Sequence, residues 1–404
     1  MGVRVSWILF CPKLMAIIHV AIISASIWLT QSLAHREFLC GDSYAAHMAH
    51  PSLSCAATVV LCVAAVALLD VCLPGALYEG PKTEGGVVPC YTDNAVAHCL
   101  FVNVAFLFAL QLSESQTTFA ELASTLNVGA LVFCAWLYYK GVRASPPRPD
   151  SATTDDPVRD FFWGVDLYPR VCGFGVKRLL NCRVSMTFWM LHGLYLLRAS
   201  WETTPDRLAL VVCALLQWAY LVKFFVWERG YMHSIDIIMD RCGFYETWGV
   251  LVFVPSVYTV HTRAIAACGA PPLPVAWALG LGGLGALSLT CNYLADRERL
   301  LFRSGKLPGA AFVSTGSGGG LLCSGWWGLC RHPQYLSEAM LAWCLALLSQ
   351  PWSNGWQTSA YASILTVVLV HRTFRDERKC ALKYGHAYQR YCSLVPYRVL
   401  PFVW

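Results

Sequence analysis

The chain has 404 residues, of which 56% are hydrophobic and 13% charged, and its formal net charge is +6. Soluble globular domains carry about 25% charged residues. The composition therefore argues against a soluble enzyme and predicts an all-α polytopic membrane protein.

In chain order, ten apolar runs approach or exceed the roughly 18 to 20 residues that cross the hydrocarbon core of a bilayer. They predict a bundle of about eight to ten transmembrane helices, with the shorter runs tilted or re-entrant. The first run is interpreted as a retained span, because it lacks a clear small-residue cleavage site. The runs are 13–34, 55–78, 95–113, 119–140, 184–199, 207–227, 244–266, 272–294, 336–350 and 357–371.

Two connectors interrupt the apolar pattern. Residues 143–156, RASPPRPDSATTDD, predict an extramembrane loop, and residues 315–320, TGSGGG, predict a second flexible connector. No Gly-Lys-Ser/Thr follows the glycines, so a P-loop is not expected. We divide the chain into N-terminal helices at 1–140, an extramembrane loop region at 141–183 and a catalytic membrane region at 184–404.

The nineteen cysteines form no C-x-x-C pair and have no regular spacing. Most lie inside apolar runs, where a free thiol behaves as a small apolar packer. We expect neither a disulfide framework nor a zinc site, and no other metal site.

Charged side chains also interrupt the apolar region between residues 223 and 241. Asp236 and Asp240 are four apart, so on a helix they would share a face. Carboxylates at membrane depth normally face a cavity or a partner. A functional pair and a structural ion pair with Lys223 or Arg241 both remain open.

Basic residues concentrate in the last quarter of the chain, which the positive-inside rule assigns to the cytosolic side. Setting topology and touching anionic lipid would explain some of them, but not the interleaved acidic and aromatic residues. The set is Arg297, Arg299, Arg303, Lys306, Arg331, Arg372, Arg375, Arg378, Lys379, Lys383, Arg390 and Arg398.

Two polar cassettes stand out, LLCSGWWGLCRHPQYLSE at 321–338 and a longer one at 371–402. In the first, Pro333 biases His332 away from helix, which predicts a short turn carrying a cation, an imidazole and a phenol. Trp327 could anchor at the interface or stack on a planar ring.

As a helix, residues 371–391 would align Arg372, Asp376 and Lys383 in one stripe. Alone, this pattern is typical of a solvated juxtamembrane helix. Together, the two cassettes favour a phosphate-bearing ligand held beside an apolar one, because Arg and Lys are the usual phosphate partners.

These cassettes resemble the sterol reductase family, whose members reduce sterol double bonds with NADPH in the endoplasmic reticulum membrane. The resemblance covers nearly the whole chain from about Leu73 and includes residues 73–94, 160–171, 223–249 and 254–259. It is strongest to the delta-7 branch, which implies reduction of 5,7-diene sterols such as 7-dehydrocholesterol. Gln334 stands where the family usually has Asn, and Met239 where it usually has His.

The resemblance also implies site residues. Reduction by protonation and hydride transfer needs an acid facing an apolar pocket, where burial raises the pKa of a carboxyl group. Asp376, Tyr258 and Glu338 are the expected acid or relay, in that order. The NADPH contacts fall in segments 295–338 and 371–398, on Arg299, Arg303, Leu322, Trp327, Gln334, Tyr335, Asp376, Cys380, Ala381, Leu382, Lys383, Tyr384 and Tyr391.

Three other functions remain as alternatives: a delta-14-sterol reductase, an isoprenylcysteine or phospholipid-type membrane methyltransferase, which shares the R-H-P-x-Y turn, and a catalytically inactive sterol-binding homologue. The expected partners are a sterol substrate, membrane lipid and other enzymes of sterol synthesis. Nucleic acid is not an expected partner.

Overall fold

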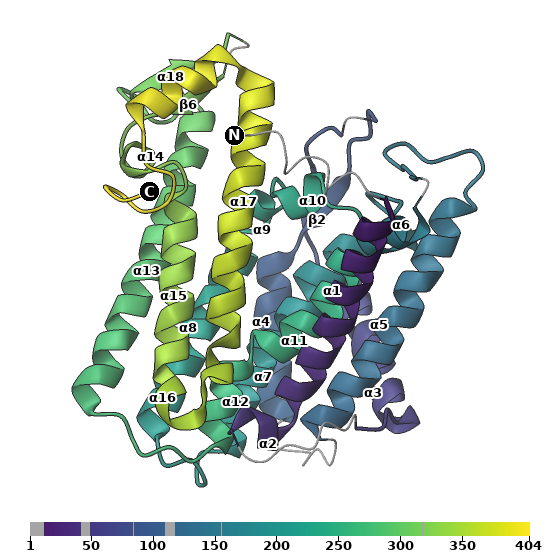
Figure 1. Ribbon diagram of the computed structural model, residues 1–404, viewed down its shortest axis with the longest axis vertical. Coiled ribbons are helices and arrows are strands. Elements are labelled where there is room, and N and C mark those ends of the chain that lie inside the picture. Colours follow the sequence, from purple (N-terminus) through teal and green to yellow (C-terminus); the bar gives the residue numbers. More distant parts are fainter. Residues whose placement is uncertain (1–11, 42–48, 84, 110–117, 155, 317–318) are drawn as a thin grey trace. The chain divides into compact units, whose positions relative to one another are not determined.

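The computed structural model is mostly helical, with three two-stranded antiparallel sheets in the part of the chain that it describes (Figure 1). The chain divides into two compact units. The first comprises residues 1–200 and 217–260, and the second residues 201–216 and 261–404. The described residues are 12–41, 49–83, 85–109, 118–154, 156–316 and 319–404.

The elements up to Val257 belong to the first unit, except that helix α8 contributes to both units. They are α1 (Pro12–Ala34), α2 (Arg36–Leu39), α3 (Leu53–Cys72), β1 (Ala76–Glu79), β2 (Cys90–Asp93), α4 (Ala95–Ala109), α5 (Phe119–Val142), α6 (Pro157–Trp163), β3 (Arg170–Val171), β4 (Phe174–Gly175), η2 (Arg178–Ser185), α7 (Met186–Ala199), α8 (Arg207–Val226), α9 (Glu228–Tyr231), α10 (Ile235–Ile238), η3 (Phe244–Phe253) and α11 (Val254–Val257).

The later elements form the second unit, apart from the first residue of α12. They are α12 (Val260–Ala267), α13 (Val275–Arg303), β5 (Phe312–Ser314), β6 (Gly320–Leu322), α14 (Trp326–Leu329), α15 (Pro333–Leu348), α16 (Pro351–Asn354), η4 (Trp356–Ser359), α17 (Ala360–Tyr384) and α18 (His386–Leu394).

Each of the ten apolar runs is helical over most of its described length, which confirms the predicted helical fold class. The run at 55–78 ends early, at Cys72, because Pro74 holds Leu73 in extended geometry (φ −74°, ψ 132°). The far end of the run at 95–113 lies outside the described residues. Among the residues that the structure describes, six helical stretches are long and apolar enough to cross a membrane: Met15–Ala34, Leu53–Cys72, Phe119–Val142, Arg207–Val226, Phe244–Ala267 and Val275–Arg303.

The core of the first unit is aromatic. Helix α5 packs on η3, and there the rings of Phe244 and Trp248 stack with centroids 4.6 Å apart. Close backbone approach holds the start of η3 against the end of α6. Gly164 has φ +89°, and a Cβ atom on it would lie 2.4 Å from the amide nitrogen of Gly243.

The region of the intramembrane charges differs in local structure from the sequence prediction. Helix α10 ends at Ile238, so Asp236 and Asp240 do not share a helical face, and that prediction is wrong. In the same unit, ion pairs with little exposure join Asp70 and Glu228 to Arg178 and Arg183. Arg183 is completely buried and donates from Nη2 to Glu228 Oε2 at 2.9 Å.

The cysteines correct a second expectation. Cys40 and Cys268 are disulfide-bonded, so the expectation that the cysteines form no disulfide framework is wrong at these two positions. The other cysteines that the structure describes are free thiols, and many are buried. Within the described ranges no group of histidine, cysteine and acidic residues could hold a metal ion.

Candidate active site

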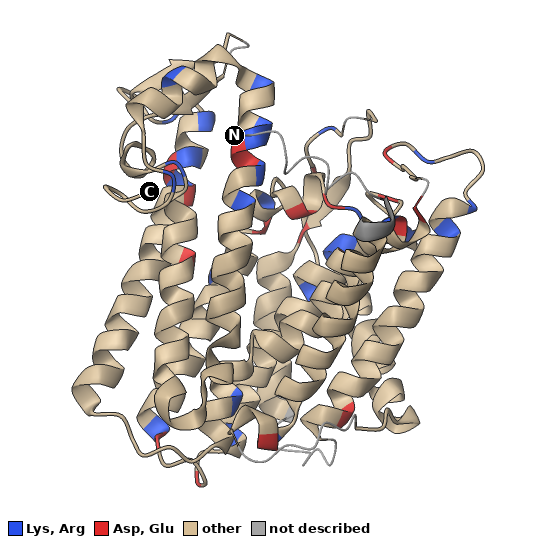
Figure 2. Ribbon diagram, viewed as in Figure 1, with Lys and Arg blue, Asp and Glu red and all other residues tan. Residues whose placement is uncertain are grey.

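One end of the second unit gathers the charged residues of both cassettes. Helix α13 packs along α15, and α15 along α17. Figure 2 shows Lys, Arg, Asp and Glu at the ends of α13 and α17 that lie beside α18, whereas the remaining lengths of these helices are largely uncharged. The cassettes are thus the polar ends of apolar helices.

The second cassette does not form the single helix over 371–391 that its sequence predicts. Helix α17 ends at Tyr384, where Gly385 takes φ +49°, and α18 then runs in a new direction from His386. A glycine with positive φ is the common way to end a helix. After this break, Tyr388 and Tyr391 of α18 pack in a buried cluster with Val313 of β5 and Val395.

The first cassette forms the predicted turn. His332 precedes α15 with non-helical backbone (φ −135°, ψ 59°), and Pro333 opens the helix. The His332 imidazole stacks on the Tyr335 ring with centroids 5.1 Å apart and planes 4° apart. Both side chains are buried.

Tyr335 joins the two cassettes. Its phenol donates a hydrogen bond of 2.5 Å to Asp376 Oδ2 on α17. Tyr335 is buried and Asp376 is half-buried. A hydrogen bond to a carboxylate away from bulk water is charge-assisted and directional. Two residues expected in the site are therefore in direct contact.

A second expected pair also meets. The guanidinium of Arg299, near the end of α13, lies over the Trp327 ring at 4.7 Å from its centroid. Trp327 is fixed because its indole Nε1 donates to the carbonyl of Ala295 at 2.9 Å. Nη2 of Arg299 pairs with Asp296 at 3.4 Å, and the side chain is 37% exposed, so its other N–H donors lie beside an aromatic face.

Glu377 is a site-region residue that the sequence analysis missed. Its Oε1 accepts from Arg331 Nε at 2.9 Å and Nη2 at 2.6 Å, and its Oε2 accepts from Arg398 Nε at 2.9 Å. The only sequence signal was a carboxylate immediately after Asp376 among basic residues. That pattern is also typical of a solvated helix.

Burial shifts the pKa of several titrating groups here. It lowers the pKa of His332 to about 4, which the nearby carboxylates Asp376 and Glu377 only partly oppose, so the imidazole is neutral at pH 7. Burial raises the pKa of the Cys380 thiol to about 11, so this cysteine is an uncharged lining group. Burial also raises the pKa of the Tyr391 phenol.

The other expected site residues differ in environment. The carbonyl of Gln334 accepts from Asn292 Nδ2 at 3.0 Å, while its side-chain Oε1 is buried without a hydrogen-bond partner. Tyr258 belongs to the first unit, where its ring meets Trp189 edge-on at 5.0 Å. Leu322 and Tyr391 are buried, Glu338, Cys380 and Tyr384 are half-buried, and Arg303, Ala381, Leu382 and Lys383 are exposed.

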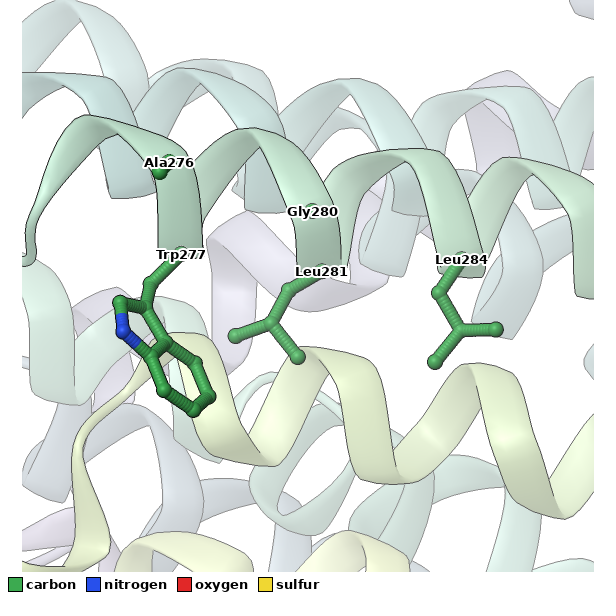
Figure 3. A pocket seen from close by; sticks show the side chains of 5 residues that line it. All are labelled: Ala276, Trp277, Gly280, Leu281 and Leu284. Atoms are coloured by element: carbon green, nitrogen blue, oxygen red, sulfur yellow. The ribbon is translucent and has the colours of Figure 1, made fainter.

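A pocket lies elsewhere on the same unit. It is an apolar groove of about 340 Å³ along α13, lined by Ala276, Trp277, Gly280, Leu281 and Leu284 (Figure 3). At 1.5 Å per residue, Leu284 is roughly 22 Å from Arg299 along the helix axis. The groove therefore contains none of the expected cofactor contacts.

Comparison with known proteins decides the family. Residues 5–404 match the model of the ergosterol biosynthesis ERG4/ERG24 family. The chain belongs to this sterol reductase family. It is 33% identical over 373 residues to a 7-dehydrocholesterol reductase of Arabidopsis thaliana, covering 86% of this chain and 84% of the relative. It is 30% identical over 371 residues to the Delta(14)-sterol reductase ERG24 of Candida albicans, covering 83% and 81%.

A mouse relative, the Delta(14)-sterol reductase TM7SF2, is 30% identical over 320 residues, with coverage of 76% and 75%. Family membership identifies the chain as an oxidoreductase with several membrane-type helices and confirms the resemblance noted in the cassettes. It also removes support from the methyltransferase alternative, because the match extends over almost the full length rather than the R-H-P-x-Y turn alone.

Proposed function

We propose that this sterol reductase reduces the delta-7 double bond of 5,7-diene sterols with NADPH, at the cytosolic side of the endoplasmic reticulum membrane. The contact of Tyr335 with Asp376 carries the proposal, because it places a phenol and a carboxylate together where two apolar helices become polar. The similarity to a 7-dehydrocholesterol reductase over most of the chain supports the choice of bond.

The residues at this end suit a phosphate-bearing nicotinamide cofactor. The cationic donors here are at least partly exposed: Arg299, Arg303 and Lys383. The guanidinium of Arg299 lies over the Trp327 ring, so a cation and an aromatic ring are side by side. Arg and Lys are the usual partners of phosphate oxygens. When bound, NADPH supplies the hydride.

The proton is the protein's task. We assign it to the Asp376–Tyr335 pair, in which one proton lies between phenol and carboxylate and can pass to a carbon of the double bond. Glu338 is three residues beyond Tyr335, so it shares that side of α15 and is the second choice of acid. Tyr258 is a third choice, from the first unit. Neutral His332, stacked on Tyr335, would help keep water away.

Expression in cells that accumulate 5,7-diene sterols tests the proposal. We expect loss of the conjugated-diene absorbance and accumulation of the matching 5-ene sterols. The Asp376→Asn variant should reach the membrane in equal amount and leave the diene unchanged. Retained diene in cells with well-expressed wild-type protein would contradict the choice of bond.

Delta-14 reduction is the second candidate, because several relatives that align over most of the chain have that name. The same cells supplied with an 8,14-diene sterol separate the two. Consumption of this substrate with retention of the 5,7-diene would assign the delta-14 bond.

A further inference from the structure

Adjacent carboxylates of α17 serve different partners. Asp376 accepts from the Tyr335 phenol, whereas Glu377 accepts from two arginines. Successive residues of a helix point about 100° apart, so the two cannot exchange roles by a simple rotation of a side chain. Glu377 is largely shielded from solvent, with 13% of its side chain exposed.

The arginine partners tie separate segments together. Arg331 is 7% exposed, and its Nη1 donates to the carbonyls of Val395 at 2.8 Å and Pro396 at 2.9 Å. The backbone amides of Arg331 and His332 donate to the carbonyls of Tyr397 and Arg398, each at 2.9 Å. We call these contacts of Glu377, Arg331 and Arg398 the Glu377 junction.

We infer that Glu377 is a positioning residue, which acts through Arg331 to hold the Tyr335 phenol against Asp376. The inference rests on the proposed function for its catalytic consequence. The backbone between Cys330 and His332 is non-helical, so local structure alone does not orient the start of α15. The guanidinium of Arg331 docks this turn on α17, and Tyr335 follows one helical turn later.

A double-mutant cycle tests the inference in the full-length protein. Glu377→Gln keeps the side-chain shape but removes the charge, and we expect kcat to fall about tenfold while the KM for NADPH changes less than about threefold. In a Tyr335→Phe background, Glu377→Gln should lower kcat by less than about a further twofold, because both substitutions disturb the same Tyr335–Asp376 hydrogen bond. Fully additive losses would overturn the inference. Glu202→Gln, which removes an exposed pair with Arg207, is the matched control and should leave kcat unchanged.

Hydrogen exchange gives a readout independent of activity. Exchange of the Arg331 and His332 amides should be about tenfold faster in Glu377→Gln than in wild type or Glu202→Gln, because their segment is no longer docked. Unchanged exchange would overturn the inference even if the wild-type protein reduced no sterol. Absence of reduction in wild type would count only against the proposed function.

Discussion

The Tyr335 phenol and the Asp376 carboxylate, 41 residues apart in sequence, share a hydrogen bond of 2.5 Å between α15 and α17. Replacing Asp376 by Asn keeps the shape but removes the charge and the proton-holding oxygen. We expect kcat to fall by about 100-fold or more, the range typical of a lost general acid, with little change in thermal stability. Turnover of purified protein and a melting curve measure both effects. Equal kcat in the two proteins would transfer the acid role to Glu338 or Tyr258.

Arg299 gives a prediction about cofactor affinity. Its guanidinium stacks on Trp327, so Arg299→Ala removes both a phosphate partner and the cover of the ring. We expect the KM for NADPH to rise about tenfold, equivalent to about 1.4 kcal/mol, with a weaker dependence on salt. Arg297→Ala is the control on the same helix, because Arg297 is exposed. Equal KM values in the two variants would contradict the assignment of Arg299.

His332 predicts a pH dependence of stability. Burial lowers its pKa in the folded protein to about 4, below the ordinary 6.5, so protonation favours the unfolded state. Stability is therefore complete above about pH 6.5 and declines as the pH falls towards 4, by at most about 3 kcal/mol. In His332→Gln this part of the decline should disappear from melting temperatures measured across that range. The exposed His386, changed to Gln, should leave the decline intact.

The buried ion pairs of the first unit predict a large effect on folding. Glu228→Ala removes the carboxylate that accepts from both Nη1 and Nη2 of the completely buried Arg183 and leaves Asp70, at 3.0 Å from Nε, as its carboxylate partner. Removing one partner of a buried ion pair typically costs about 3–5 kcal/mol. Unfolding of the detergent-solubilised variant should show this loss, whereas Glu202→Ala should change stability by less than about 0.5 kcal/mol. A similar stability for both variants would mean that Asp70 alone compensates the charge of Arg183.

Two glycines with a similar positive φ differ in the space available for a side chain. Gly164 and Gly173 have φ of +89° and +86°, but only Gly164 has no room for a Cβ atom. Gly173→Ala should cost about 1–2 kcal/mol for the left-handed backbone alone. Gly164→Ala should cost clearly more, because α6 and η3 must also move apart. Comparable melting temperatures for the two variants would contradict this account.

Much of the fold could be predicted because a membrane leaves few choices. Long apolar runs must satisfy their backbone within a helix, so the ten runs located the helices, and Pro74 explains where one ended early. The turn at His332 followed likewise from the local effect of Pro333. Asp236 and Asp240 were misread because a spacing of four indicates a shared face only if the helix continues between them.

Residue type and local spacing are enough to predict the helical membrane class and the polar cassettes, and the resemblance of the cassettes indicates the family. Which charges meet depends instead on how the helices pack. Glu377 differs from Asp376 by one position, yet one binds the C-terminal segment through two arginines and the other binds Tyr335. Arg183 and Glu228, 45 residues apart, pair because packing brings η2 and α9 together. Such contacts depend on the direction of side chains around packed helices, which composition and periodicity do not encode.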